Sequence, residues 1–436
     1  MIQNQIEAMK KLLIIFSIFS AIFSSCRKDE LVTEVTPSMA RDTLYYIMKQ
    51  WYYWYDKMPS VTKENYADPY ELLEALRYRP LDRWSRVADY NAFIASLQGS
   101  FVGHGIRIGL DESENARIAM IYKNSPLYAS GVRRGWIIKT INGYDIADII
   151  RRNDNEEYDK ALGPSEEGVT NVFLFSPPGL PDVSITSTKR SFTINTVLLY
   201  DTIHLSTGSI TGHLVLSAFV DPTENELRTA FAFFKATNVK DFILDLRYNH
   251  GGYLDLAQKL ASYIAGSSLT GSVFAKLQYN GKNQDANKTY PFVATLYPLA
   301  VSKLVVITSH STASASEAVM NGLSPKITVV SVGDTTEGKP TGMNSWPCGK
   351  KYYFSPVTFK VVNSLNQGDY YDGFPPDSRV TDDITRNFDD RQEECLREAI
   401  LYLETGQFSG KGEKSFHRSV QFTEKPSLIN NTFIRK

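Results

Sequence analysis

Hydrophobic positions follow two different rhythms along the chain, and the change between them separates its regions. Aromatic and leucine side chains recur at helical spacing over Arg41–Asp56 and Tyr70–Tyr78, with a proline after each run. Short apolar stretches punctuated by glycines follow, which is typical of a small β-rich module. The pattern therefore predicts a helical N-terminal domain over 41–98 and a β-rich domain over 99–198.

The second half of the chain alternates strand-like and helix-like segments. Apolar runs that predict strands occur at Gly212–Ser217, Asp241–Leu246, Leu304–Thr308 and Ile327–Val332. Helical patterns lie between them, for example over Glu224–Ala236 and Tyr253–Ala265. This alternation favours an α/β domain, a mainly parallel sheet with covering helices. We predict that this domain spans 199–406 and that 407–436 is a C-terminal extension of low order.

The first residues predict a signal peptide over 1–25. Lys10 and Lys11 precede the apolar run Leu12–Phe23, which is too short to span a membrane. Two serines and Cys26 close the run, and this arrangement resembles the lipoprotein box of bacterial lipoproteins. The resemblance implies a membrane anchor through a lipid on Cys26. An ordinary secretory signal with an incidental cysteine is the alternative.

Residues 26–40 are polar and aperiodic, and we expect them to form a tether. Arg27-Lys28-Asp29-Glu30 resembles the surface-export signal of Bacteroidetes lipoproteins. The resemblance implies a lipid-anchored protein of the cell envelope at the outer membrane. Exposure on the cell surface is one of the two faces that the sequence leaves open.

Composition narrows the class of partner. With 42% hydrophobic and 22% charged residues the chain has an ordinary globular composition. Its net charge of −1 gives no electrostatic reason to expect nucleic acid as a partner. No CxxC or HExxH motif occurs in the sequence, so we expect no metal and no cofactor. Cys348 and Cys395 could form one disulfide or remain two thiols.

The segment Thr312–Glu317 carries the first candidate for chemistry. It lies between an apolar strand and a short helix, where outward N–H groups and the helix dipole favour a developing oxyanion. Ser314 in this segment needs a base to take its proton. None of the six histidines has a recognisable triad context. Lys339, held between Gly338 and Pro340, can be that base if burial lowers its pKa.

A glycine pair supplies candidate oxyanion donors. Gly251 and Gly252 end the segment that follows the strand Asp241–Leu246. Because ligands in open α/β sheets bind beyond the carboxyl ends of strands, this pair and Ser314 are expected to share one crevice. The N–H of Gly251 or Gly252 and that of Ala315 are therefore the predicted oxyanion donors.

Three motifs occur in order: Asp245-Leu-Arg-x-Asn-x-Gly-Gly252, Ser314-Ala-Ser-Glu317 and Thr336-x-Gly-Lys339. The ordered set resembles the C-terminal processing (tail-specific) serine peptidases over roughly Arg41 to Leu403. The resemblance implies a crotonase-like α/β fold, with Ser314 as nucleophile and Lys339 as general base. Ser316 is the alternative nucleophile. The family often has a glutamine four residues after its lysine, where this chain has Met343, so Asn344 is a candidate for orienting the amine.

A second resemblance concerns the β-rich region. Gly103-His104-Gly105-Ile106, then Ser125-Pro126 and Gly131, then Gly135–Gly143 resemble a PDZ domain, with Trp136 where that family usually has aspartate. The resemblance implies that a peptide adds as a strand and that its carboxylate binds at Gly103, His104, Gly105 and Ile106. A β module that only braces the enzyme is the alternative.

These expectations combine into one function. The chain is expected to be an envelope serine endopeptidase that cleaves proteins or peptides with exposed C-termini through an acyl-enzyme. A catalytically weak or inactive peptide-binding relative is the alternative, and Met343 keeps it open. An esterase or amidase for small substrates is the third class.

Overall fold

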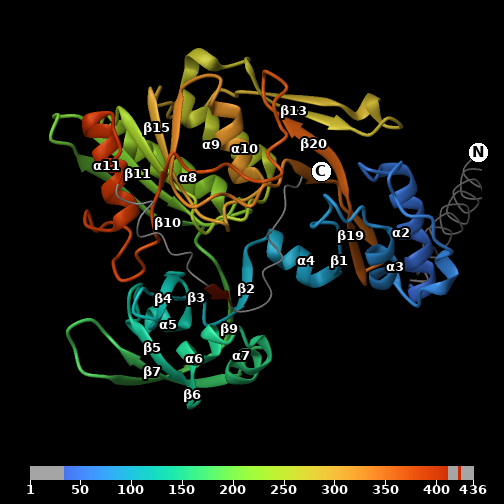
Figure 1. Ribbon diagram of the computed structural model, residues 1–436, viewed down its shortest axis with the longest axis horizontal. Helices are drawn as coiled ribbons and strands as arrows, with labels where there is room; N and C mark the ends of the chain where they lie inside the picture. The colour runs from blue at the N-terminus through green and yellow to red at the C-terminus, as the bar shows by residue number, and fades with distance from the viewer. Residues whose placement is uncertain (1–33, 411–420, 424–436) are drawn as a thin grey trace, which may run out of the picture. The chain divides into compact units, whose positions relative to one another are not determined.

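A computed structural model describes residues 34–410 and 421–423 of the chain. From Pro37 onward the described residues belong to one unit, and Figure 1 traces its elements. The predicted signal peptide over 1–25 and the lipidation site Cys26 lie outside the described residues. Within the described part, no helix combines the length and the apolar character that a membrane span requires.

The N-terminal region is helical, as predicted, but it also contributes a strand. Its helices are α2 (Pro37–Trp51), α3 (Pro69–Leu76) and α4 (Tyr90–Leu97), with a 3-10 turn at Lys63–Asn65. The strand β1 (Arg86–Asp89) pairs antiparallel with β19 (Tyr352–Ser355), which also pairs with β18 (Trp346–Cys348). The strand β1 was not predicted, because its four half-polar residues show no alternating pattern and its partner β19 lies far along the chain.

The β-rich region is built on one sheet with the order β22-β3-β4-β5-β7-β8, and β6 pairs with β5. The strands are β3 (Ile106–Leu110), β4 (Ala116–Ile121), β5 (Ile137–Ile141), β6 (Tyr144–Asp145), β7 (Thr170–Ser176), β8 (Val183–Thr188) and β22 (Gln421–Thr423). A separate pair joins β2 (Ser100–Gly103) to β9 (Arg190–Thr193). The helices are α5 (Pro126–Ala129), α6 (Ile146–Arg151) and α7 (Asn155–Leu162).

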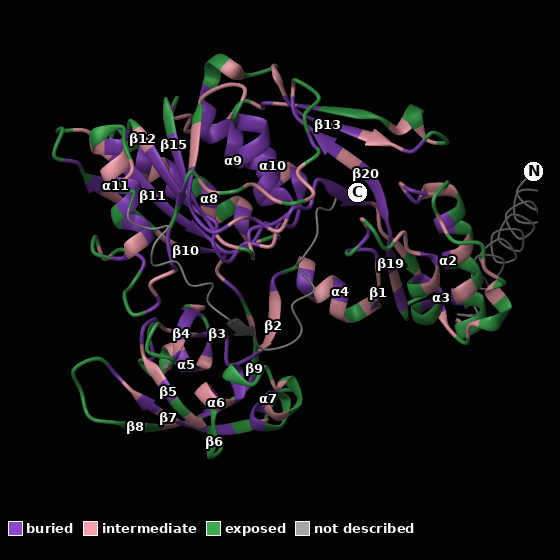
Figure 2. Cartoon of the chain, in the orientation of Figure 1, coloured by how far each residue is buried: buried purple, intermediate pink, exposed green. Residues whose placement is uncertain are grey.

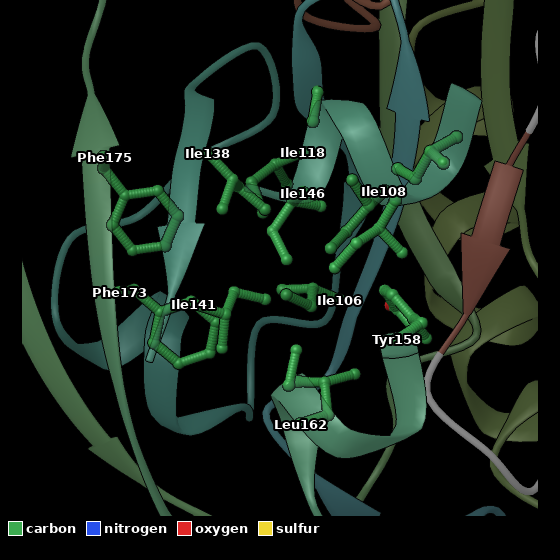
Figure 3. Packing of buried hydrophobic residues seen from close by; sticks show 14 of the residues in the cluster. Ile106, Ile108, Ile118, Ile138, Ile141, Ile146, Tyr158, Leu162, Phe173 and Phe175 are labelled. Carbon is green, nitrogen blue, oxygen red and sulfur yellow. The ribbon is translucent and has the colours of Figure 1, made fainter. Parts of the chain in front are cut away.

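One apolar cluster holds this region together. Figure 3 shows isoleucines from β3, β4 and β5 facing Phe173 and Phe175 of β7, with α6 and α7 contributing Ile146, Tyr158 and Leu162. These side chains alternate with exposed positions along β7, so one face of that strand is buried. The apolar pattern of residues 99–198 thus arises mainly from this sheet, whose inner strands β3 and β4 are largely buried and whose strand β7 has one buried face.

The predicted parallel sheet is present in the C-terminal half, in the order β10-β11-β12-β15-β16-β21. All neighbours from β11 onward are parallel, and β10 pairs antiparallel at one edge. The strands are β10 (Val197–His204), β11 (Ile210–Leu216), β12 (Asp241–Asp245), β15 (Lys303–Thr308), β16 (Thr328–Gly333) and β21 (Ser378–Arg379).

Helices cover both faces of this sheet, and the core strands are buried (Figure 2). On one face, Phe231 of α8 (Thr223–Ala236) stacks on Phe242 of β12, and Phe234 meets the same ring edge-to-face. On the other, Leu396 of α11 (Glu394–Thr405) packs with Ile243 of β12. The remaining helices are α9 (Leu254–Ala265) and α10 (Ala315–Leu323), which pack on each other.

A second, antiparallel sheet was not predicted. Its order is β14-β13-β20-β17, formed by β14 (Lys288–Pro291), β13 (Val273–Tyr279), β20 (Val357–Val362) and β17 (Thr341–Met343). Two 3-10 turns, Ser267–Leu269 and Gln284–Ala286, flank β13. Of the predicted C-terminal extension, 411–420 and 424–436 lie outside the described residues, and 421–423 form the edge strand β22.

Candidate active site

Three loops meet at the carboxyl ends of adjacent parallel strands. Asp245 at the end of β12 is opposite Ile307 of β15, and Thr308 at the end of β15 is opposite Gly333 of β16. The loops that leave these strands carry the glycine pair, Ser314 and Lys339. The sheet register therefore brings together the three motifs that were expected to share a crevice.

Ser314 occupies an unusual backbone position at the start of α10. Its φ is 63° and its ψ is −111°, a region that non-glycine residues rarely adopt. The residue is 1% exposed, and its backbone N–H donates to Glu317 Oε2 over 2.8 Å. Surrounding contacts must hold such a conformation in place, and Glu317 provides the first of them.

The buried carboxylate of Glu317 joins the serine loop to the lysine loop. Besides the Ser314 N–H, its Oε2 accepts the backbone N–H of Lys339 over 2.8 Å. Its Oε1 accepts the N–H of Gly338 over 2.7 Å and the hydroxyl of Thr336 over 2.6 Å. Burial raises the pKa of Glu317 to about 7, while these four donors favour the ionised form.

The side chain of Lys339 is shielded from solvent. It is 1% exposed, and burial lowers its pKa to about 7, with Arg86 acting in the same direction and Glu337 against it. Its Nζ lies 5.8 Å from the ring centre of Trp84, whose Nε1–H donates to Glu337 Oε1 over 2.6 Å. The lysine is therefore poised to be a neutral amine near neutral pH.

Trp84 and Arg86 come from the N-terminal region, which the sequence analysis treated as separate from the catalytic residues. They line a cavity of about 550 Å³ together with Arg77, Arg83 and Glu337. No motif signals this role, because the wall arises when β1 pairs with β19 far along the chain. Glu317 could have been found, since Ser314-x-x-Glu317 is the pattern of a helix capping box.

Each glycine of the pair is closely packed, Gly251 against Ser314 and Gly252 against Phe219. A Cβ on Gly251, whose φ is 104°, would stand 2.8 Å from the Cβ of Ser314, and one on Gly252 would meet Phe219 O at 2.1 Å. The N–H of Gly251 donates to Asn249 Oδ1 over 2.9 Å. The N–H groups of Gly252 and Ala315 have no partner among residues 34–410 and 421–423, so these two are available to an oxyanion.

Asn249 links the glycine loop to the serine loop. Its backbone oxygen accepts the Ala313 N–H over 3.1 Å and the Ser316 hydroxyl over 3.0 Å. Its amide donates to Leu216 O of β11 over 3.1 Å. Ser316, the alternative nucleophile, is thus fully buried and engaged in a structural hydrogen bond.

A buried ionic cluster around Arg247 anchors the glycine loop and the serine loop. Arg247 Nε donates to both carboxylate oxygens of Asp245, and its Nη1 donates to Asp382 Oδ1 over 2.7 Å and to Glu393 Oε1 over 2.8 Å. Burial alone would raise the pKa of Asp382, but Arg134 and Arg247 lower it to about 2. The Arg247 carbonyl accepts the hydroxyl of Ser309, which anchors the start of the serine loop.

Two histidines of the catalytic domain, His213 and His250, are poorly suited to the role of base. His213 is buried and His250 is partly buried, and desolvation lowers the pKa of each to about 3. His250 Nε2 accepts a hydrogen bond from Arg107 Nη2 over 2.7 Å, so its ring is held neutral with that nitrogen occupied.

The loop predicted to bind a carboxylate is anchored by His104. Asn171 Nδ2 donates to Ala161 O and Leu162 O, so its Oδ1 accepts from His104 Nε2–H over 2.7 Å, and His104 Nδ1 accepts from Ser187. Burial lowers the pKa of His104 to about 4. The neutral imidazole thus holds this segment in place from inside the domain. Gly103 ends β2, Gly105 lies between the two strands, and Ile106 begins β3.

The structure also bears on Asn344, on the two cysteines and on possible metal ligands. The Asn344 carboxamide is paired with the Tyr279 hydroxyl over 3.2 Å, which gives no support to its orienting role. Cys348 and Cys395 are free thiols, so the disulfide alternative is wrong. Within the described part of the chain, no group of three or more His, Cys, Asp or Glu residues is arranged to hold a metal.

A serine at a helix start, a buried lysine and two open N–H groups are the parts of a serine-type peptidase. Residues 210–380 match the model of peptidase family S41, and residues 40–86 match the peptidase S41 N-terminal domain. Together the two matches take in about half of the chain. The chain belongs to peptidase family S41.

Known relatives agree with this membership. The carboxy-terminal processing protease CtpB of Bacillus subtilis is 22% identical over 360 residues, which cover 78% of this chain and 71% of that protein. A carboxyl-terminal-processing protease of Picosynechococcus is 25% identical over 285 residues, 65% of each chain. About a third of each relative's length therefore lies outside the aligned region.

Among solved structures, an S41 protease from Bacteroides fragilis superposes with a TM-score of 0.69 at 24% identity. The match covers 84% of this chain and 97% of that one. At this identity the likeness establishes the fold. It also supports an N-terminal domain and mixed sheets as parts of that fold.

The close approach of Gly251 to Ser314 generates a prediction. Gly251→Ala should destabilise the protein by more than the roughly 1–3 kcal/mol expected for a strained backbone alone, and should abolish peptide cleavage, because the new methyl group displaces Ser314. Gly271→Ala is the matched control, since its φ is 85° and nothing lies within 4 Å of the added Cβ. Urea denaturation and a peptidase assay measure both effects. Equal losses in the two variants would contradict the argument.

Proposed function

We propose that the chain is a serine endopeptidase in which Ser314 is the nucleophile and Lys339 the general base. The observation that carries the proposal is the Glu317 carboxylate, which holds the backbone of both residues around one buried centre. A lysine with a pKa of about 7 can accept a proton at neutral pH, which an exposed lysine cannot do efficiently.

The reaction follows from these positions. Lys339 Nζ takes the hydroxyl proton as Ser314 Oγ bonds to the peptide carbonyl carbon, and the N–H groups of Gly252 and Ala315 donate to the resulting oxyanion. Collapse breaks the C–N bond, and the proton passes from Lys339 to the leaving amine. Lys339 then deprotonates a water molecule that attacks the acyl-enzyme, which releases the acid and restores Ser314.

We further propose that the β-rich region is PDZ-like and captures the C-terminal segment of the substrate. Its sheet carries the strand β3, which begins at Ile106, the last residue of the predicted carboxylate-binding segment Gly103–Ile106. The His104 imidazole fixes that segment through two ring hydrogen bonds. The family relatives that are named for carboxy-terminal processing support substrates with exposed C-termini.

Single substitutions test the dyad. Ser314→Ala and Lys339→Ala should each lower kcat by about 10⁴-fold or more on an unfolded protein with a free, apolar C-terminus, because the two groups act as a unit. Ser324→Ala, at an exposed position after α10, and Lys326→Ala nearby are matched controls that should keep full activity. Ser316→Ala should lower stability and retain cleavage. Full activity in Ser314→Ala would remove the proposal, and binding without cleavage in the wild type would favour an inactive relative.

The pH dependence has a definite sign. The reactive base is neutral Lys339, whose fraction rises as pH passes the lowered pKa of about 7. We therefore expect kcat/KM to rise about tenfold per pH unit below that value and to level off above it. A fluorogenic peptide assayed between pH 5 and 9 measures the profile. A flat profile over this range, or one that falls with pH, would exclude a lysine base.

We also propose that the protein is lipid-anchored in the cell envelope through Cys26, at the outer membrane. The support is the sequence alone, an apolar run closed by small residues and a cysteine. Cys26→Ser should move the protein from the membrane fraction to the soluble fraction of expressing cells. Ser25→Ala serves as the neighbouring control. Retention of Cys26→Ser in membranes would contradict the anchor.

A further inference from the structure

The edge of the β-rich sheet is occupied by a segment from the end of the chain. The strand β22 pairs antiparallel with β3, with Gln421 opposite Gly109, Phe422 opposite Ile108 and Thr423 opposite Arg107. On its other side β3 pairs with β4. Both hydrogen-bonding edges of β3 are therefore used, one of them by residues that follow the catalytic domain.

The direction of β22 matches that of a captured peptide. Successive residues of β22 pair with successively earlier residues of β3, so the C-terminal end of β22 points toward Ile106 and the loop Gly103–Ile106. A substrate strand whose carboxylate is held at this loop must run in the same direction along the same edge. The two strands would therefore use the same main-chain groups of β3 and exclude each other.

The occupied edge borders the catalytic loops. Arg107, the residue opposite Thr423, also donates to His250 Nε2 over 2.7 Å and to Ser311 Oγ over 3.2 Å. His250 immediately precedes the glycine pair, and Ser311 lies in the loop that leads to Ser314. A strand on β3 is thus in position to affect how substrate reaches the site.

We propose that β22 is an internal competitor, so that the chain's own C-terminal segment occupies the peptide-capture edge until a substrate displaces it. This inference rests on the proposed capture of substrate strands by β3. Because β22 is tethered to the same chain, its effective concentration at the edge is on the order of millimolar. It pairs over only three residues, and Thr423 at the end of the strand is an internal residue that carries no terminal carboxylate.

A substrate with a terminal carboxylate has the contacts that β22 lacks. Main-chain pairing is similar for any extended segment, and the carboxylate adds charge-assisted bonds at the loop. The tail should therefore exclude weakly binding or internal segments from β3, whereas a segment that ends in a free carboxylate should displace it. The tail in this way acts as a filter on substrate class as well as a competitor.

The test uses the full-length chain with Ser314→Ala, so that bound peptide is not cleaved. Gln421→Pro together with Phe422→Pro removes two backbone N–H groups from β22, at least one of which faces β3 in an antiparallel ladder. Ser415→Pro with Phe416→Pro is the matched control, the same exchange in the same tail outside β22. Binding of a fluorescein-labelled peptide that ends in a free Ala-Leu-Val carboxylate is followed by fluorescence anisotropy.

We expect the β22 variant to bind this peptide about tenfold more tightly than its parent and the matched control. Hydrogen exchange of residues 106–110 should quicken in the β22 variant and slow again when peptide is added. In the parent, added peptide should quicken exchange in 421–423. Equal affinities and unchanged exchange across the three proteins would overturn the inference.

Other outcomes separate this inference from the proposed function. If none of the proteins binds the peptide, the proposed capture of peptides on β3 is wrong, and so is the proposed role of β22 as a competitor. If the β22 variant gains affinity while the chain with Ser314 intact cleaves nothing, the catalytic assignment fails and the competitor stands. If cleavage is normal but β22 substitution changes neither affinity nor exchange, only the competitor is removed.

Discussion

The arrangement of the site depends on one buried carboxylate, that of Glu317. An ionised group out of contact with water is costly unless hydrogen bonds replace its hydration, and here four donors do so. Two of these donors are the backbone N–H groups of Ser314 and Lys339, which lie in loops that follow different strands. The same bond that satisfies the carboxylate also helps hold Ser314 at its positive φ.

A second buried charge, the guanidinium of Arg247, also holds the loops of the site in place. Arg247 connects the end of β12 with Asp382 and with Glu393 at the start of α11, and its carbonyl anchors Ser309. Buried ion pairs of this kind add little stability of their own, because desolvation offsets most of the attraction. Their contribution here is to position the loops, because only one arrangement of the loop ends keeps these buried charges paired. The apolar faces of β12, packed on α8 and α11, supply the stability that these polar groups do not.

Sequence patterns predicted the parts of this structure that repeat locally. The runs around Phe242 and Val305 have the length and apolarity of buried strands, and the ordered motifs placed Ser314, Lys339 and the glycine pair in neighbouring loops before any fold was known. The missed features depend on partners distant in the chain. The strand β1 and the antiparallel sheet around β13 show no regular hydrophobic spacing in their own sequence. Trp84 lies beside Lys339 only once β1 has paired with β19. Asn344 is near Lys339 in sequence, but its backbone N–H donates to Thr358 of β20 and its side-chain amide donates to the Tyr279 hydroxyl.

The dependence of Lys339 on that wall changes how the N-terminal region is understood. A lysine in water keeps its proton at neutral pH, and only desolvation or a neighbouring cation lowers its pKa. Trp84 covers the amine and Arg86 adds positive charge beside it, and both residues precede or begin β1. Residues 40–86 are therefore a structural component of the base rather than a separate appendage. Loss of Trp84 and Arg86 would uncover the Lys339 amine and remove a nearby positive charge, and both changes would raise its pKa toward the ordinary value.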